Sequence, residues 1–365
     1  MSFLSCNPSV FVVGNDYQLV VLCKDEGTCV LRVGEETFYD TVDGILKSTK
    51  CHKFILPQSV LDAAEGYSLT FGKTIEKQSY WSTREKEETV EYSFRPVKKT
   101  EDIRAMYLAD IHAMYEKAMV PASYFGEELD FLIMNGDFGE LYREEDFALL
   151  LSFLGEITKG EMPLLFVRGN HDTRGKLSEY LTDYIGTDNG KTYFTFAFGP
   201  FSGLALDCGE DKPDAHEVYG GFNCFECFRK EELRFLKSAK LENRPYTFAI
   251  CHVPFMYSAA MHGEFAIMPE LYKEWGKRVE ALNPDFMICG HMHRYDQLAP
   301  NDERSLFPHS YPVIIASEWK AGTDNNPLLR MTAVTFRKDE TEFSYIDENG
   351  KPIKTFTCPT RRHLR

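Results

Sequence analysis

LLFVRGNHD, residues 164–172, joins a short apolar run to a cluster of polar side chains. The apolar residues 164–167 have the length and composition of a buried strand. Asn170, His171 and Asp172 follow it almost at once, and these residue types can bind metal ions or transfer protons. In an α/β sheet, ligands bind outside the carboxyl ends of the strands. The stretch therefore predicts a strand of an α/β sheet that ends in a functional site.

Four other predicted strands end in the same way. Each apolar run is followed directly by Asp, Asn or His: residues 103–108 by Asp110 and His112, residues 131–134 by Asp137, residues 246–250 by His252, and residues 286–288 by His291 and His293. Because these strand ends should share one edge of the fold, we expect the side chains to meet. Carboxylate, amide and imidazole groups without clustered thiolates favour a pair of divalent ions (Mn, Fe, Zn or Mg) over a structural zinc site.

The segments between these strands show helical periodicity, whereas the first hundred residues do not. Helices are predicted at residues 144–157, 176–184 and 269–282. The N-terminal region instead has short alternating segments separated by turn residues, such as residues 14–16, 26–27 and 33–34. We predict a small antiparallel β-sandwich of the immunoglobulin or fibronectin kind over residues 1–97, a linker near residues 95–99, and a catalytic domain over residues 98–365.

Composition limits the partners and the location. The chain has 365 residues, a hydrophobic fraction of 43% and a net charge of −15, which disfavours a nucleic-acid polymer as partner but allows a small phosphorylated substrate. No apolar run is long enough to cross a membrane, and the N-terminus does not resemble a signal peptide. Ten cysteines are then expected to be reduced, which predicts a cytoplasmic protein. Cys224 and Cys227 form a C-x-x-C pair that we interpret as packing rather than as a zinc or redox site.

The ordered series of motifs resembles the calcineurin-like metallophosphoesterase family. The motifs are Asp110-x-His112, Gly136-Asp137, Gly169-Asn170-His171-Asp172, His252 and Gly290-His291-x-His293. The resemblance implies a four-layer α/β/β/α sandwich with a dinuclear metal centre at one edge. It implies that Asp110, His112 and His293 hold one ion, that Asn170, His252 and His291 hold the other, and that Asp137 bridges them. The N-terminal β-rich region is similar to the sandwich that precedes the catalytic domain of purple acid phosphatases.

The resemblance also implies a mechanism for phosphate-ester hydrolysis. A hydroxide bridging the two ions would attack the phosphorus in line. His171 would protonate the leaving oxygen, and Asp172 would orient the imidazole of His171. Arg168 or Arg174 could bind a phosphate oxygen, or could simply be solvated.

Two subgroups of the family fit the motifs less well. Purple acid phosphatases place a tyrosine ligand in the second motif, whereas here residues 138–140 are Phe-Gly-Glu and Tyr142 comes later; their first motif also lacks the histidine found at His112. Protein Ser/Thr phosphatases share the arginine of residues 167–172, but their second motif continues Asp-x-x-Asp-Arg, which this chain lacks. We therefore do not extend the resemblance to the ferric ion of the purple enzymes.

Two alternatives to a phosphomonoesterase remain open at this point. The same ligands would serve a phosphodiesterase that acts on nucleotides or cyclic nucleotides. The choice would depend on segments expected to wall the site, namely residues 113–128, 209–228 and 254–268, which are rich in Tyr, Phe and Met. The second alternative is a non-catalytic scaffold with a vestigial metal site. It is disfavoured because every expected ligand position carries a residue that can bind metal.

Overall fold

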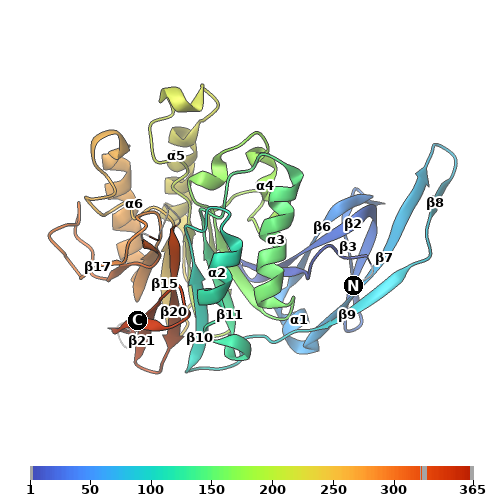
Figure 1. Ribbon diagram of the computed structural model, residues 1–365, viewed down its shortest axis with the longest axis horizontal. Helices are drawn as coiled ribbons and strands as arrows, with labels where there is room; N and C mark the ends of the chain where they lie inside the picture. The colour runs from blue at the N-terminus through green and yellow to red at the C-terminus, as the bar shows by residue number, and fades with distance from the viewer. Residues whose placement is uncertain (1–2, 321, 323–326, 362–365) are drawn as a thin grey trace.

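Two β-sheets packed face to face and covered by helices on both sides form the centre of the molecule (Figure 1). The computed structural model describes residues 3–320, 322 and 327–361. One buried cluster lies between the two sheets, a second lies between the first sheet and its helices, and a third lies between the second sheet and its helices. This confirms the predicted α/β/β/α arrangement.

The first sheet contains three of the predicted site strands side by side. β10 (Ile103–Leu108), β11 (Phe131–Asn135) and β12 (Pro163–Val167) pair in parallel. The antiparallel strands β20 (Leu328–Phe336), β21 (Glu340–Ile346) and β22 (Pro352–Pro359) extend the sheet beyond β10. Its outer face packs against α2 (Tyr115–Ala122) and α3 (Glu144–Thr158).

The second sheet contains the other two site strands. β15 (Tyr246–Cys251) and β16 (Phe286–Cys289) pair in parallel at its centre. The sheet is completed by β13 (Phe194–Phe198) and β14 (Phe201–Leu206) on one side and by β18 (Val313–Ile315) and β17 (Asp296–Leu298) on the other. Its outer helices are α5 (Phe225–Ser238) and α6 (Pro269–Leu282). Proline suits the first turn of α6, because the N–H it lacks would have no partner there.

The N-terminal β-rich region is continuous with the first sheet. β1 (Ser9–Val13) pairs in parallel with β12 and antiparallel with β2 (Asp16–Val33). Beyond β2 come β3 (Glu36–Tyr39), β6 (Thr49–Pro57), β7 (Gly66–Lys77), β8 (Ser82–Arg84) and β9 (Glu88–Ser93), with the short hairpin β4 (Thr41–Val42) and β5 (Ile45–Leu46) and the helix α1 (Gln58–Ala64). β7 and β8 extend far from the body of the molecule (Figure 1). The domain boundary at residue 97 stays a prediction, but the first strand lies within the catalytic sheet.

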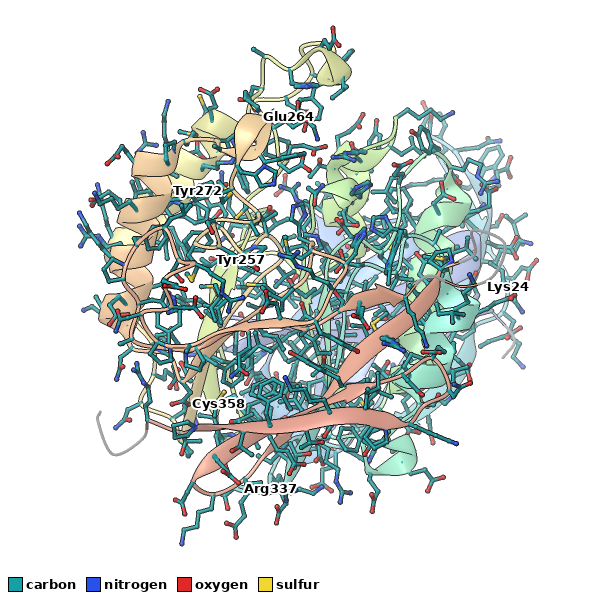
Figure 2. The ribbon with its side chains drawn as sticks, turned by 60° about the vertical axis from the view of Figure 1, so that its left-hand side comes forward. Lys24, Tyr257, Glu264, Tyr272, Arg337 and Cys358 are labelled. Carbon is teal, nitrogen blue, oxygen red and sulfur yellow. The ribbon has the colours of Figure 1, made fainter. Side chains whose placement is uncertain are left out.

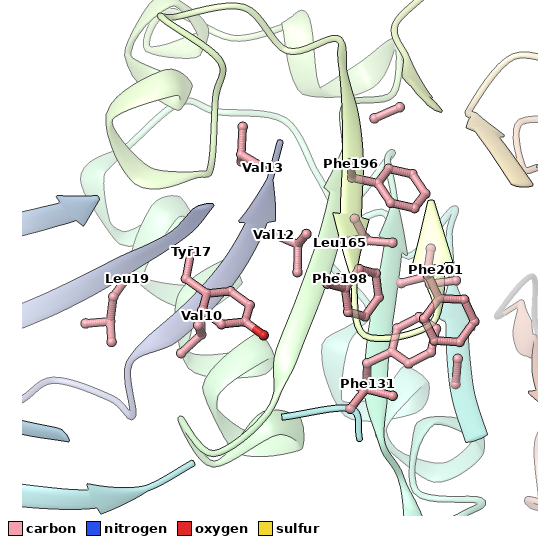
Figure 3. Packing of buried hydrophobic residues seen from close by; sticks show 14 of the residues in the cluster. Val10, Val12, Val13, Tyr17, Leu19, Phe131, Leu165, Phe196, Phe198 and Phe201 are labelled. Carbon is pink, nitrogen blue, oxygen red and sulfur yellow. The ribbon is translucent and has the colours of Figure 1, made fainter. Parts of the chain in front are cut away.

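Aromatic side chains fill the space between the two sheets (Figure 3). Phe131 of β11 contacts Phe198 and Phe201 of the second sheet, with ring centroids 5.2 and 5.0 Å apart. Val10 and Val12 of β1 belong to the same cluster (Figure 3). Because interiors of this kind are close-packed, the cluster fixes how the two sheets, and hence the two halves of the site, meet.

Most predicted elements are present, but two local predictions are wrong. Residues 26–27 form no turn, since β2 runs through them; Gly27 has an ordinary φ, and an added Cβ would lie 2.4 Å from Phe71. The glycine therefore allows close packing rather than chain reversal. The predicted helix 176–184 is present in shortened form, as a 3-10 turn at Ser178–Tyr180 that continues into the short α4 (Leu181–Tyr184). Residues 113–128, expected as a loop, contain α2, which buries Ala118 and Ala122.

Among the described residues, no helix is both long enough and apolar enough to cross a membrane.

Candidate metal centre

The polar residues that follow the five site strands converge at one edge of the two packed sheets. Several of them have a left-handed backbone, with φ of 56° at Asp110, 53° at Asp137 and 70° at His291. Such conformations are costly for residues other than glycine and are concentrated at functional sites. These sharp turns at the strand ends bring the side chains inward to a common point.

One group of ligand atoms comes from both sheets. Suitable atoms of Asp110, His112, Asp137 and His293 all lie within 4.8 Å of one another. His293 Nε2 is 3.2 Å from Asp110 Oδ1, and His112 Nε2 is 3.6 Å from Asp137 Oδ2. Asp110 and Asp137 are fully buried, whereas the two histidines are partly exposed.

A second group shares Asp137 with the first. Atoms of Asp137, His252 and His291 meet the same 4.8 Å limit. His252 Nε2 lies 3.1 Å from Asp137 Oδ2, and Asn170 Oδ1 lies 3.0 Å from His291 Nδ1. All seven predicted ligands are therefore brought together, and Asp137 is the residue common to both groups.

The donor set fits a pair of cations. The carboxylates of Asp110 and Asp137 are buried, and among the described residues their ion-pair partners are histidines. Burying two carboxylates in this way is costly without cations. His252 Nε2 and Asn170 Nδ2 are buried without a hydrogen-bond partner among the described residues. The Nδ1 atom of His252 lies 2.7 Å from the carbonyl oxygen of Asn135, which turns its Nε2 toward the carboxylates. Close approach matters at Gly136, where a Cβ would lie 2.3 Å from Gly169 N.

The site charges shift the pKa values of its own members. Burial would raise the pKa of Asp137, but His252 outweighs this and holds that pKa well below its usual range. Burial would lower the pKa of His252, but Asp137 and Asp110 raise it to about 10. For His112 and His291 burial dominates and lowers each pKa to about 4. Two of the ligand imidazoles are thus neutral and ready to bind a cation near neutral pH.

Comparisons with known proteins agree with this geometry. The model of the calcineurin-like phosphoesterases matches residues 103–295, which is more than half of the chain. The chain belongs to the calcineurin-like phosphoesterase family. It is a metal-dependent phosphoesterase, and the two groups of ligands described above are candidates for the dinuclear metal centre that is typical of the family. No curated protein matches this phosphoesterase.

Two solved structures share the fold of the phosphoesterase. A purple acid phosphatase from yellow lupin (Lupinus luteus) seeds aligns with a TM-score of 0.61 and 12% identity, over 99% of this chain and 75% of that chain. PhoD aligns with a TM-score of 0.52 and 10% identity, over 98% and 89%. At such identities the likeness concerns the fold, and it includes the N-terminal β-rich region.

His171 lies at the open side of the centre. Its ring contacts that of His112, with centroids 4.6 Å apart, and its backbone N–H donates to Asp137 Oδ1 at 2.8 Å. The side chain is 27% exposed, so that a substrate can reach it. His171 belongs to neither potential metal cluster of the described residues, and its role as the acid stays a prediction.

Asp172 does not orient His171, and this part of the prediction is wrong. Its buried carboxylate accepts hydrogen bonds from the backbone N–H groups of Gly169 at 2.7 Å and of Asp137 and Phe138 at 3.0 Å. These hydrogen bonds join the loop of Asp137 to the loop of Gly169. The His171 ring instead lies within 3.5 Å of Glu140 Oε1 and within 3.2 Å of Arg174 Nη1.

The two arginines proposed for phosphate binding have different surroundings. Arg168 donates to the buried Asp207 at 2.8 Å and packs over the rings of Phe225 and Phe228. It is therefore engaged within the fold. Arg174 pairs with Glu210 through two hydrogen bonds of 2.7 and 2.8 Å while its Nη1 contacts His171.

Sequence reasoning missed two residues that contact the ligand Asp110. Ser317 Oγ donates to its carboxylate, and Trp319 Nε1 donates to its backbone carbonyl at 2.7 Å. Both follow β18, a short apolar strand beside β16. The signal that could have identified them is the same as for the other loops, an apolar run (residues 313–315) followed by polar residues.

Two of the predicted wall segments contact each other. Residues 209–228 and 254–268 are joined by His216 and Glu264, whose Nε2 and Oε2 atoms are 3.3 Å apart, and by Lys212, which lies 4.6 Å from the ring centroid of Phe265. Figure 2 shows Glu264 near the base of a protruding loop and Tyr257 nearer the body of the molecule. Cys224 and Cys227 are exposed free thiols at the start of α5, and neither belongs to a potential metal cluster of the described chain.

Proposed function

We propose that this phosphoesterase hydrolyses small phosphomonoesters, with His171 protonating the leaving oxygen. The observation that carries the proposal is the relation of His171 to Asp137. Asp137 is shared by both ligand groups, and one of its carboxylate oxygens accepts the backbone N–H of His171. A substrate phosphate held by the two ions that share this carboxylate would have its leaving group within reach of the imidazole.

In this proposal each ligand has a defined task. Asp110, His112 and His293 would hold one divalent ion and Asn170, His252 and His291 the other, with Mn, Fe and Zn the metals that these donors favour. Such a pair supplies an acidified water and neutralises charge that develops on the phosphate oxygens. Asp172 keeps the loops of Asp137 and Gly169 at a fixed separation.

Arg174 supports the preference for monoesters. A monoester carries one more negative charge than a diester, and the Arg174 guanidinium, which contacts His171 and pairs with Glu210 and Asp211, would attract that charge. Glu210 fixes the position of the guanidinium without covering it fully, since the arginine side chain is 26% exposed.

The substrate class can be tested with two chromogenic esters of the same phenol. The metal-loaded enzyme is expected to hydrolyse the phosphomonoester with a higher kcat/KM than the phosphodiester. A Glu156→Gln variant, changed on the exposed face of α3, is the control and should keep the wild-type kcat/KM on both esters. A preference for the diester would favour the nucleotide phosphodiesterase, and the aromatic residues of segment 209–228, such as the exposed Phe222, would then be candidates for base stacking.

The role of His171 can be tested separately. His171→Ala should bind both metals normally and lose about 10²- to 10⁴-fold in kcat on alkyl phosphates, whose leaving oxygen must be protonated. The loss should be much smaller on a nitrophenyl phosphate, which leaves as an anion. Equal losses on both substrates, or none on either, would remove His171 from the proton transfer.

We place the protein in the cytoplasm. All ten cysteines are free thiols, which is the state expected in a reducing compartment.

A further inference from the structure

Trp319 is in contact with the metal centre although it lies outside the sequence that matches the family. It belongs to the short strand β19 (Glu318–Lys320), which pairs with β20. Its indole stacks on the imidazole of His293, with centroids 4.0 Å apart and planes 17° apart. The same indole meets the ring of His112 edge-on at 4.9 Å.

The remaining polar contacts of Trp319 reach the same group of ligands. Its indole N–H donates to the carbonyl of Asp110 at 2.7 Å, and its backbone N–H donates to the carbonyl of His293 at 3.1 Å. The indole also packs against the apolar cluster on the outer face of the first sheet, but its ring contacts and its hydrogen bond involve Asp110, His112 and His293. None of them involves Asn170, His252 or His291, the ligands of the second group.

These three ligands need outside support because their backbones are strained. Asp110, His112 and His293 have φ values of 56°, 45° and 49°, in the left-handed region that favours glycine. Strained conformations persist only where the surroundings fix them. Stacking on the indole fixes the ring plane of His293, and the indole N–H bond fixes the backbone carbonyl of Asp110. Both contacts hold the side chains of the Asp110–His112–His293 group in place around one ion. An electron-rich indole face also stabilises positive charge on an imidazole that binds a cation.

We propose that Trp319 is a positioning residue that sets the affinity of the Asp110–His112–His293 group for its metal ion. The proposal rests on the metal centre of the proposed function, but it does not depend on the substrate. It predicts an asymmetric centre, in which the two ions differ in their dependence on one aromatic side chain. Its test is therefore a binding measurement rather than an assay of activity.

The experiment is calorimetric titration of the metal-free protein with Zn²⁺, without substrate. Trp319→Leu should lower the affinity for one Zn²⁺ ion by about 10- to 100-fold, the usual effect of losing a group that orients a ligand. The affinity for the other ion should stay unchanged. Trp319→Phe, which keeps a stacking ring but loses the N–H donor, should show a smaller loss at the same ion. Trp81→Phe is the matched control, because Trp81 is 58% exposed on the distant β7–β8 arm.

Two ligand variants assign the affected ion. In a His291→Ala background, which retains the Asp110–His112–His293 group, Trp319→Leu should abolish most of the remaining binding. In a His112→Ala background, which retains the Asn170–His252–His291 group, Trp319→Leu should change the remaining Zn²⁺ affinity less than twofold. Far-UV circular dichroism and the urea unfolding midpoint establish that each variant is folded. If Trp319→Leu does not fold, Trp319→Phe is compared with the wild type instead.

Fluorescence provides an independent signal. The chain has three tryptophans, of which only Trp319 touches a ligand of the centre. Zn²⁺ binding should change the emission of the wild-type protein and of Trp81→Phe, but not of Trp319→Phe. Unchanged Zn²⁺ affinities in Trp319→Leu, or equal losses at both ions, would overturn the proposal, whatever the outcome for phosphoester hydrolysis.

Discussion

At the scale of single residues, the centre shows how the same motif can supply groups with different tasks. Asn170, His171 and Asp172 are adjacent in the chain. Asn170 lies among the ligands, His171 is partly exposed, and Asp172 is buried beneath the loops. The sequence indicates that all three are polar and belong to one strand end. It does not indicate which backbone N–H groups lie in reach of Asp172, because two of these donors come from another strand, about 35 residues earlier.

Removing the Asp172 carboxylate should therefore affect stability and metal binding together. Asp172→Ala leaves three buried N–H donors without an acceptor and should lower the free energy of unfolding by at least about 3 kcal/mol. Urea unfolding measures this, with Asp172→Asn as the conservative comparison. If Asp172→Ala kept its stability and lost activity only on alkyl phosphates, like His171→Ala, Asp172 would belong to the acid catalyst after all.

A pH-dependent prediction follows from His252. Its pKa is raised to about 10 in the metal-free protein, so below that pH the imidazole carries a proton, whereas His112 and His291, with pKa values of about 4, do not. Metal uptake at pH 8 must remove the His252 proton. Titrations in buffers of different ionisation enthalpy should therefore show about one proton fewer released by His252→Asn than by the wild type. Equal proton release would contradict the charged state assigned to His252.

At the scale of elements, the strands and long helices follow from the sequence because their apolar periodicity is strong. The residues of α3 and α6 match the predicted ranges within one position. What fails is the interpretation of turn residues where tertiary packing decides the outcome. Gly27 looks like a turn but allows close packing against Phe71, and β1 looks like part of a separate domain but pairs with β12. Pairings between residues so distant in the chain leave no local signal.

The pairing of β1 with β12 predicts that the catalytic part does not fold alone. A chain of residues 98–365 would leave an edge of β12 unpaired and would expose the apolar surfaces that Phe11 and Val12 cover in the full chain. We expect this fragment to aggregate or to lack a cooperative thermal transition by circular dichroism, while the full chain unfolds in a single step. A fragment that is monomeric and unfolds cooperatively would show instead that residue 97 is a true domain boundary.

At the scale of the whole molecule, the site depends on two sheets meeting at a fixed angle. Asp110, Asp137 and Asn170 follow strands of the first sheet, whereas His252, His291 and His293 follow strands of the second. The aromatic cluster between the sheets sets their separation and so the distances between ligands. The ligands could be predicted from the sequence because every one follows an apolar strand. Ser317 and Trp319 also follow an apolar strand, but their contacts with Asp110 are evident only in space, and Glu210 carries no comparable signal.

The most direct test of the central claim is the metal content of the wild type and of Asp137→Asn, measured by elemental analysis after dialysis. Because Asp137 belongs to both ligand groups, the wild type should hold two divalent ions per chain and the variant should lose most of both. Asp25→Asn, changed at an exposed carboxylate on β2, should retain two. Two ions retained in Asp137→Asn, or fewer than two in the wild type after incubation with excess metal, would contradict a centre built around a shared carboxylate.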